Sequence, residues 1–174
     1  MRAPRLTLPV EPGAILVLGL GNTILQDEGL GVRALERLAQ DYALPPRVRT
    51  LDGGIMGLDL LPFLAGDDGS PAVSGLLVLD AVQTNRAPGA LVRLEGAEIR
   101  AALGLKMSMH QVGLQELLAV AAFQGTLPPR VVVWGIEPAA LGTGCELSPL
   151  IEARLPLLVE AAATELQRWT HVGD

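Results

Sequence analysis

The apolar residues of the chain gather in short runs that alternate with segments of helical periodicity. The run Ala14–Gly19 is continuously apolar, which is typical of a strand buried on both faces of a sheet. From 28 to 40 apolar residues recur at helical spacing with charged residues between them. Strands at 48–51 and 76–79 and a short helix at 55–64 complete this part of the chain. Such alternation predicts right-handed crossovers and a mainly parallel sheet with helices on both faces.

The next connection breaks this alternation. Only residues 81–89 separate the third strand from the strand-like segment 90–94, and parallel pairing needs a crossover of roughly a dozen residues. The fourth strand should therefore be antiparallel. A helical segment at 98–105 would then carry the chain back across the sheet and bring His110 near the carboxyl ends of the first three strands.

The remainder predicts a helix at 112–123, a fifth strand at 131–136 and a final helix from Ser148-Pro149 to about Trp169. We therefore expect an α/β fold, a single-domain three-layer sandwich. Its twisted five-stranded sheet is mainly parallel with one antiparallel strand, and helices cover both faces. The single domain would span residues 1–174, with an N-terminal arm at 1–13 and a flexible tail at 170–174.

Length and composition narrow the class of protein. The chain has 174 residues, of which 49% are hydrophobic and 18% charged, which suits one core. Mean hydropathy is +0.39, but the apolar stretches are far shorter than the roughly 18 residues that a membrane span needs. We expect no membrane insertion. No secretory signal is visible, so the cytoplasm is the expected location.

Charge and rare residue types exclude further classes. Lys and Arg number 13 against 19 Asp and Glu, and aromatic residues make up 3%, so the features of a nucleic-acid-binding surface are missing. Cys145 is the only cysteine, which excludes an intrachain disulfide and a thiolate zinc cluster. A single thiol fits a reducing compartment.

Carboxylates follow three of the predicted strands. Asp27 and Glu28 come after the first strand, Asp52 ends the second and Asp80 ends the third. Ligands of open α/β sheets bind at the carboxyl ends of strands. We interpret Asp27 as the cap or dipole partner of the adjacent helix. For Asp80 no helix begins nearby, and a buried carboxylate needs a proton, a base or a cation.

The two histidines differ in their surroundings. His171 lies in the polar tail, where we expect it to be exposed. His110 precedes a helix whose apolar side is already supplied by other residues, and the predicted return of the chain brings it to the carboxylates. Two carboxylates and an imidazole suit a borderline divalent ion, with zinc, nickel and manganese all possible. Three protein ligands leave open coordination positions for water or for donors from another molecule.

Other chemistries have weaker motifs. Gly19 and Gly21 suggest dinucleotide binding, but Ile24 stands where the third glycine is needed and Asp52 is too distant for the ribose-binding acid. The glycines instead permit a tight turn. The His-Glu-x-x-His zinc motif and the Gly-x-Ser-x-Gly elbow are both absent. Cys145 with His110 as its base is a further candidate for nucleophilic catalysis, although lone cysteines are usually inert.

Five blocks of the sequence resemble one family. They are GLGNTILQDEGLGV, LDGGIMGLDLL, LLVLDAV, MSMHQVGLQELL and WGIEP, and they extend from Ile15 to about Trp169. Together these blocks resemble the endopeptidases that mature the large subunit of nickel-iron hydrogenases. The resemblance implies a metal site at Glu28, Asp80 and His110 and a twisted five-stranded sheet with one antiparallel strand. One departure is Ile55, where the DGG block of the family commonly continues with threonine, so any hydroxyl role there is lost.

The resemblance implies a single cut that removes the C-terminal extension of the large-subunit precursor after nickel insertion. Nickel would be supplied by this substrate, without an organic cofactor, and a sensor of nickel should keep its own donors vacant. Hydrolysis would use a nickel-polarised carbonyl, a water activated by Glu28 or Asp80, or Asp52 as general base. Asp52, with Gly53 and Gly54, could instead orient the substrate tail.

The expected partner is this precursor, and we expect the protein to act as a monomer. Two alternatives from other classes stay open. One is a nickel-binding chaperone or sensor that uses the same three ligands without proteolysis. The other is a nucleotide-binding α/β module.

Overall fold

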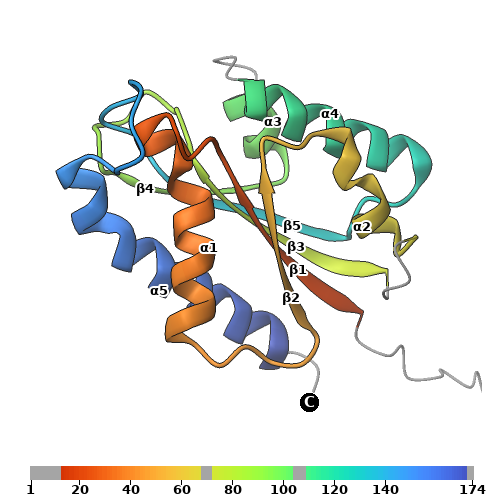
Figure 1. Ribbon diagram of the computed structural model, residues 1–174. Helices are drawn as coiled ribbons and strands as arrows, with labels where there is room; N and C mark the ends of the chain where they lie inside the picture. The colour runs from red at the N-terminus through yellow and green to blue at the C-terminus, as the bar shows by residue number, and fades with distance from the viewer. Residues whose placement is uncertain (1–12, 68–71, 104–108, 172–174) are drawn as a thin grey trace, which may run out of the picture.

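The computed structural model describes residues 13–67, 72–103 and 109–171, and in these ranges the fold is a twisted sheet between two layers of helices (Figure 1). The sheet has five strands in the order β2-β1-β3-β5-β4. Their bounds are β1 Ala14–Leu20, β2 Val48–Gly54, β3 Val73–Ala81, β4 Leu91–Glu95 and β5 Arg130–Ile136. Only the β4–β5 pair is antiparallel among these strands. The predicted fold class is confirmed.

Two layers of helices cover the two faces. Helices α1 (Leu30–Asp41) and α5 (Pro149–His171) lie on one face, and α2 (Leu61–Ala65), α3 (Ala97–Leu103) and α4 (Met109–Gln124) lie on the other (Figure 1). Each face buries its own apolar core. Because side chains alternate along a strand, from Ile15 in β1 and Gly75 in β3 onward the odd-numbered residues face α1 and α5, and the even-numbered residues face α4.

The central strands owe their position to continuous apolar sequence. Every residue of β1 is buried, and β3 is buried at eight of its nine positions, as a strand covered on both faces requires. β3 begins three residues before the predicted Leu76. Its early residue Gly75 leaves room for the ring of Trp169 from α5, because a Cβ there would lie 2.9 Å from that ring. This packing joins residues far apart in sequence, so the apolar run alone did not indicate it.

The antiparallel strand and the returning helix are confirmed. β4 pairs with β5 from Leu91 opposite Ile136 to Glu95 opposite Val132. α3 then leads away from the end of β4, and α4 begins at Met109. Residues 104–108, which include the first two residues of the block around His110, lie outside the described residues.

Helix bounds differ from prediction at several ends. A 3-10 turn, η1 (Gln26–Gly29), precedes α1, and the expected helix at 55–64 is a second 3-10 turn, η2 (Leu58–Leu60), followed by α2. α5 continues to His171, whose side chain is exposed as expected. The expected N-terminal arm, up to residue 12, and tail residues 172–174 lie outside the described part. Even α5, the longest described helix, lacks the apolar stretch that crossing a bilayer would take.

Candidate functional site at the carboxyl ends of the strands

Glu28 is positioned by two glycines that let the backbone pack without side chains. Gly21 follows β1 with a φ of +126°, and a Cβ there would overlap the carbonyl oxygen of Glu28. A Cβ on Gly31, in the first turn of α1, would overlap the carbonyl oxygens of Leu20 and Leu79. The turn that carries Glu28 is therefore seated directly on the ends of β1 and β3.

These contacts also bear on the dinucleotide interpretation. In a nucleotide-binding turn, the second glycine allows the pyrophosphate to approach the backbone. Here the space at Gly21 is filled by the chain itself, through the carbonyl of Glu28. The glycines therefore serve the tight turn that the sequence also allowed.

Asp80 is the second carboxylate at this edge. It is the penultimate residue of β3 and is only 1% exposed. Side chains alternate along a strand, so Asp80 lies on the same face of the sheet as Leu76 and Val78, which is the face that α4 covers. One carboxylate oxygen, Oδ1, accepts a hydrogen bond of 2.8 Å from the backbone N–H of Ala81. A carboxylate thus lies at the end of an otherwise apolar buried strand.

The backbone of His110 lies in the first turn of α4, and its side chain is outside the described residues. The position of this turn is nevertheless fixed by Gly113, one turn further on. An ideal Cβ on Gly113 would lie 3.2 Å from the Cα of Gly57, and the same distance separates a Cβ on Gly57 from the Cα of Gly113. Gly57 lies three residues after β2, so α4 begins beside the carboxyl end of that strand.

The donor types at this edge suit a divalent ion. Carboxylates of Glu28 and Asp80 offer oxygen, and His110 would add nitrogen. Among the side chains that the structure describes, no three His, Cys, Asp or Glu residues form a group that could hold a metal ion, and the imidazole of His110 is not one of those side chains. The three-residue metal site stays a prediction.

Asp52 has a different position from Asp80. It lies on the edge strand β2, is exposed, and accepts a 2.9 Å hydrogen bond at Oδ1 from the N–H of Gly54. In the sheet register Asp52 and Leu79 flank Gly19 on either side, so Asp52 shares the α1 face while Asp80 belongs to the opposite face. Asp52 is open to a ligand that approaches from outside the sheet.

The two glycines after Asp52 serve the fold in separate ways. Gly53 is buried, and a Cβ there would lie 2.7 and 2.9 Å from the side chains of Leu18 and Leu20. Gly54 adopts a φ of +45° and accepts a 2.8 Å hydrogen bond from the N–H of Gly21. These contacts join the turns after β1 and β2. Substrate recognition by the two glycines stays a prediction.

Asp27 has a structural role that the sequence did not reveal. Its buried carboxylate accepts four hydrogen bonds of 2.7–2.9 Å, from the N–H groups of Ala139, Ala140 and Ser148 and from the hydroxyl of Ser148. It makes no cap for the adjacent helix, where the N-cap residue Gly29 has no side-chain bond. The cap interpretation was wrong, because Asp27 holds the loop after β5 and the start of α5.

A further buried carboxylate, Glu137, was missed by the sequence analysis. It follows β5 directly and is 6% exposed. Its Oε2 accepts hydrogen bonds from the N–H and hydroxyl of Thr84, at 2.7 and 2.9 Å, and from the N–H of Arg86 at 3.3 Å. It therefore fixes the loop after Asp80. The signal in the sequence was an acid closing a strand, within the block WGIEP.

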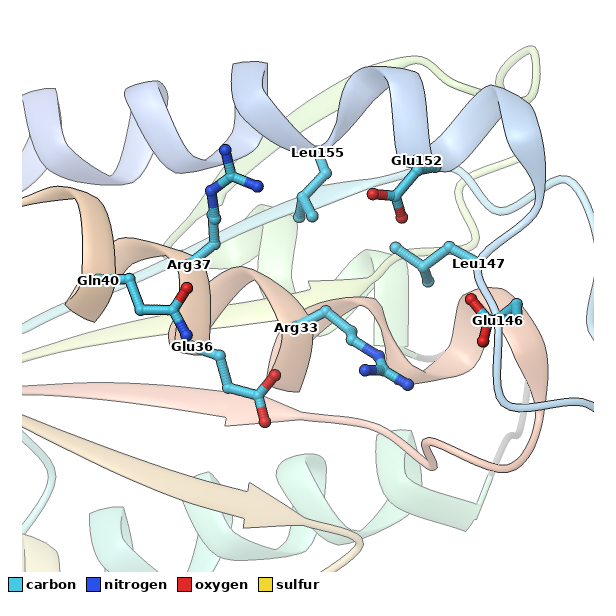
Figure 2. A pocket seen from close by; sticks show the side chains of 8 residues that line it. All are labelled: Arg33, Glu36, Arg37, Gln40, Glu146, Leu147, Glu152 and Leu155. Atoms are coloured by element: carbon cyan, nitrogen blue, oxygen red, sulfur yellow. The ribbon is translucent and has the colours of Figure 1, made fainter.

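A polar cleft of about 300 Å³ lies between α1, α5 and residues 146–147 (Figure 2). Both arginines and glutamates line it, and Arg33 donates a 2.6 Å hydrogen bond to the carbonyl of Cys145. The exposed Cys145 thus lies against α1, whereas α4, which carries His110, covers the other face. The Cys145–His110 catalytic pair stays a prediction, because the side chain of His110 lies outside the described residues.

An open α/β sheet with carboxylates at its carboxyl edge defines a class that binds and transforms ligands at that edge. Comparisons with known proteins narrow the class. A family model described as hydrogenase maturation protease matches residues 32–165. The chain belongs to the hydrogenase maturation protease family, and it is a peptidase.

Individual relatives agree with this assignment. The hydrogenase 2 maturation protease of Escherichia coli K12 is 37% identical over 154 residues, covering 88% of this chain and 90% of the relative. The hydrogenase expression/formation protein HupD of Rhodobacter capsulatus is 40% identical, covering 91% of this chain and 74% of the relative. The solved hydrogenase maturating endopeptidase HybD of E. coli matches with a TM-score of 0.81 at 36% identity, covering 89% of this chain and 93% of that structure.

Proposed function

We propose that this peptidase removes the C-terminal extension of the large-subunit precursor of a nickel-iron hydrogenase, and that it does so once nickel has been inserted. Glu28, Asp80 and His110 would bind the nickel ion presented by the precursor. The observation that supports this proposal is that the turn of Glu28, the end of β3 with Asp80 and the start of α4 each lie at the carboxyl ends of the strands.

The donor set explains why the metal would come from the substrate. Two carboxylates and an imidazole leave coordination positions open, and those positions can be filled by groups of the precursor that already hold nickel. An ion shared by both proteins positions the scissile bond near the enzyme. A precursor without nickel offers the donors nothing to bind, so it should resist cleavage.

Asp52 would contact the substrate rather than the metal. It is exposed on the edge strand and belongs to the face opposite that of Asp80. Its carboxylate can accept hydrogen bonds from the extended tail of the precursor, beside Gly53 and Gly54. Nickel would then polarise the scissile carbonyl towards attack by water.

The test is incubation of the enzyme with precursor that carries nickel and with precursor that lacks it, followed by mass spectrometry of the precursor. We expect loss of the C-terminal extension only from the nickel-loaded form. Glu28→Gln and His110→Ala should abolish this cleavage and change the free energy of unfolding by less than about 1 kcal/mol. Glu36→Gln and His171→Ala, at exposed positions, serve as matched controls and should cleave normally.

Three outcomes would contradict the proposal. Equal cleavage of nickel-free precursor would favour an ordinary protease. A stable complex without any loss of mass would favour a nickel-binding chaperone or sensor. Nucleotide binding that survives His110→Ala, measured by calorimetry, would favour a nucleotide-binding module.

A further inference from the structure

Large apolar side chains are exposed in three segments around the candidate site. We name this set the apolar rim. It comprises Ile24 after β1, three residues after β2 and Leu141 after β5, with the following exposed fractions: Ile24 57%, Ile55 63%, Met56 36%, Leu58 44% and Leu141 43%. Exposed apolar residues that gather in one region mark interaction surfaces more often than residues scattered singly.

The three segments are tied to one another by backbone hydrogen bonds. The N–H of Gly21 donates to the carbonyl of Gly54 at 2.8 Å, which joins the segments after β1 and β2. The N–H of Gly144 donates to the carbonyl of Ile24 at 2.9 Å, and Gln26 donates back to Gly144 at 2.8 Å, which joins the segments after β1 and β5. The apolar rim is therefore carried by one connected set of turns.

The fold itself does not require apolar side chains at these positions. Ile24 satisfies its backbone groups through the Asn22 side chain and Gly144, and these bonds involve no side-chain atom of Ile24. Ile55 follows Gly54 in a turn where polar residues are usual. Exposed β-branched residues in such turns are therefore candidates for contact with another molecule.

The breadth of the apolar rim indicates a folded partner. Its outer segments follow β2 and β5, which are three strand spacings apart in the sheet order, or about 14 Å. An extended peptide covers a single narrow line, and it would leave one side of this surface in water. A folded surface can contact all three segments at once.

We propose that the apolar rim docks the folded body of the large-subunit precursor, separately from the contacts that the metal and the scissile segment make. This inference rests on the proposed function and deepens it. Glu28 lies four residues after Ile24, and Asp52 lies three residues before Ile55, so the segments that carry the apolar rim also carry these carboxylates.

Nickel-free precursor tests the apolar rim better than nickel-loaded precursor does, because docking through apolar side chains needs no metal. Its affinity for wild-type enzyme and for the variants Ile24→Ser, Ile55→Ser and their combination can be measured by calorimetry. We expect the double variant to bind at least tenfold more weakly, since truncating central apolar contacts has effects of this size. With nickel-loaded precursor, KM should rise by a similar factor while kcat stays within twofold.

Two further variants control the experiment. Phe123→Ser removes a side chain that is 93% exposed near the far end of α4, and it should change neither affinity nor KM. Leu141→Ser alters the segment on the opposite side of the apolar rim and should weaken binding on its own. Circular dichroism should show the same helix content in every variant, because none of these side chains is buried.

The proposal fails if the double variant binds nickel-free precursor within twofold of the wild-type affinity. It also fails if the wild-type protein sediments as a dimer that the double variant dissociates, because a second copy would then cover the apolar rim. If the wild type binds the precursor but never cleaves it, the proposed function fails, and the affinity series still tests the docking surface.

Discussion

At the scale of single residues, adjacent acids have opposite uses. Asp27 is completely buried and its carboxylate is saturated by backbone and hydroxyl donors, whereas Glu28 is half-buried at the edge where ligands bind. A buried anion without a basic partner is stabilised when enough N–H groups converge on it. The pair DE therefore combines a structural residue with a candidate ligand, and mutation should separate the two roles.

Asp27→Asn should destabilise the protein by about 2–4 kcal/mol. An amide group cannot accept at its nitrogen, so at least one buried donor from Ala139, Ala140 or Ser148 loses its partner. Urea unfolding followed by circular dichroism measures the loss. Asp41→Asn is the control, because its surface pair with Arg37 should contribute less than about 1 kcal/mol. Equal effects of the two variants would contradict the structural role of Asp27.

Asp80→Asn should keep the fold and lose the processing of nickel-loaded precursor. Asparagine has nearly the same shape, can accept from the N–H of Ala81, and carries no charge that needs solvation at a buried strand end. We expect a free energy of unfolding equal to or above that of the wild type. If Asp80→Asn unfolds the domain, and processing falls only in proportion to folded protein, Asp80 is structural and the three-ligand site must be abandoned.

At the scale of elements, the position of helix α1 depends on Gly31, which has no side chain in the first turn of the helix. Gly31 brings its first turn onto the carbonyl oxygens at the ends of β1 and β3, and this contact sets the height of Glu28 above the sheet. A glycine inside a helix is otherwise unfavourable by about 1 kcal/mol relative to alanine. Close packing on the strands outweighs that intrinsic preference.

Gly31→Ala should therefore destabilise the protein by more than about 3 kcal/mol, although alanine is the better helix former. The added methyl group would overlap two backbone oxygens that cannot move without disturbing β1 or β3. Gln40→Ala, at an exposed position of the same helix, should change stability by less than about 0.5 kcal/mol. Thermal unfolding of both variants compares the two effects, and a stable Gly31→Ala protein would contradict the packing argument.

The predictability of each element from sequence depends on how local its causes are. The apolar run of β1 and the short connection before β4 are local features of the sequence. The buried strand and the antiparallel strand that follow from them were therefore predicted. The partners of Asp27 lie more than a hundred residues further on, and the acid beside a helix start indicated a cap instead. The contact between Gly113 and Gly57 also joins residues that are distant in sequence, so no local pattern indicated it. Sequence pattern therefore predicted the sheet and its carboxylate edge, but not the contacts that fix the turns.

At the scale of the whole molecule, a buried ionic network joins the edge strand to the rest. Glu165 of α5 accepts two hydrogen bonds from Arg93 of β4, at 2.9 and 3.0 Å, and one each from the indole N–H groups of Trp134 and Trp169. Burial by itself raises the pKa of Glu165, but Arg93 and the two indoles together lower this pKa to about 2. The network links β4, β5 and α5.

This network predicts a specific loss of stability in acid. The folded-state pKa of Glu165 lies below its ordinary value of 4.5, so its contribution is full above pH 4.5 and disappears as the pH falls towards 2. A shift of this size corresponds to about 3 kcal/mol. Glu165→Gln should be less stable than the wild type by roughly that amount at pH 7, and the difference should narrow below pH 4.5.

Urea unfolding at a series of pH values measures this difference directly. Glu160→Gln, an exposed change on the same helix, is the control and should show a small difference at every pH. A gap between wild type and Glu165→Gln that stays constant from pH 7 to pH 3 would contradict the assignment of acid sensitivity to Glu165.

The three proposed nickel ligands come from different layers of the sandwich. Glu28 belongs to the turn that leads into α1, Asp80 to the sheet, and His110 to α4 on the opposite face. A chain in which either helical layer had failed to assemble would present two donors at most. Under the proposed assignment, only a completely folded protease could bind the nickel ion of the substrate with all three ligands. Binding of the ion would therefore depend on correct folding of the enzyme as well as on correct loading of the substrate.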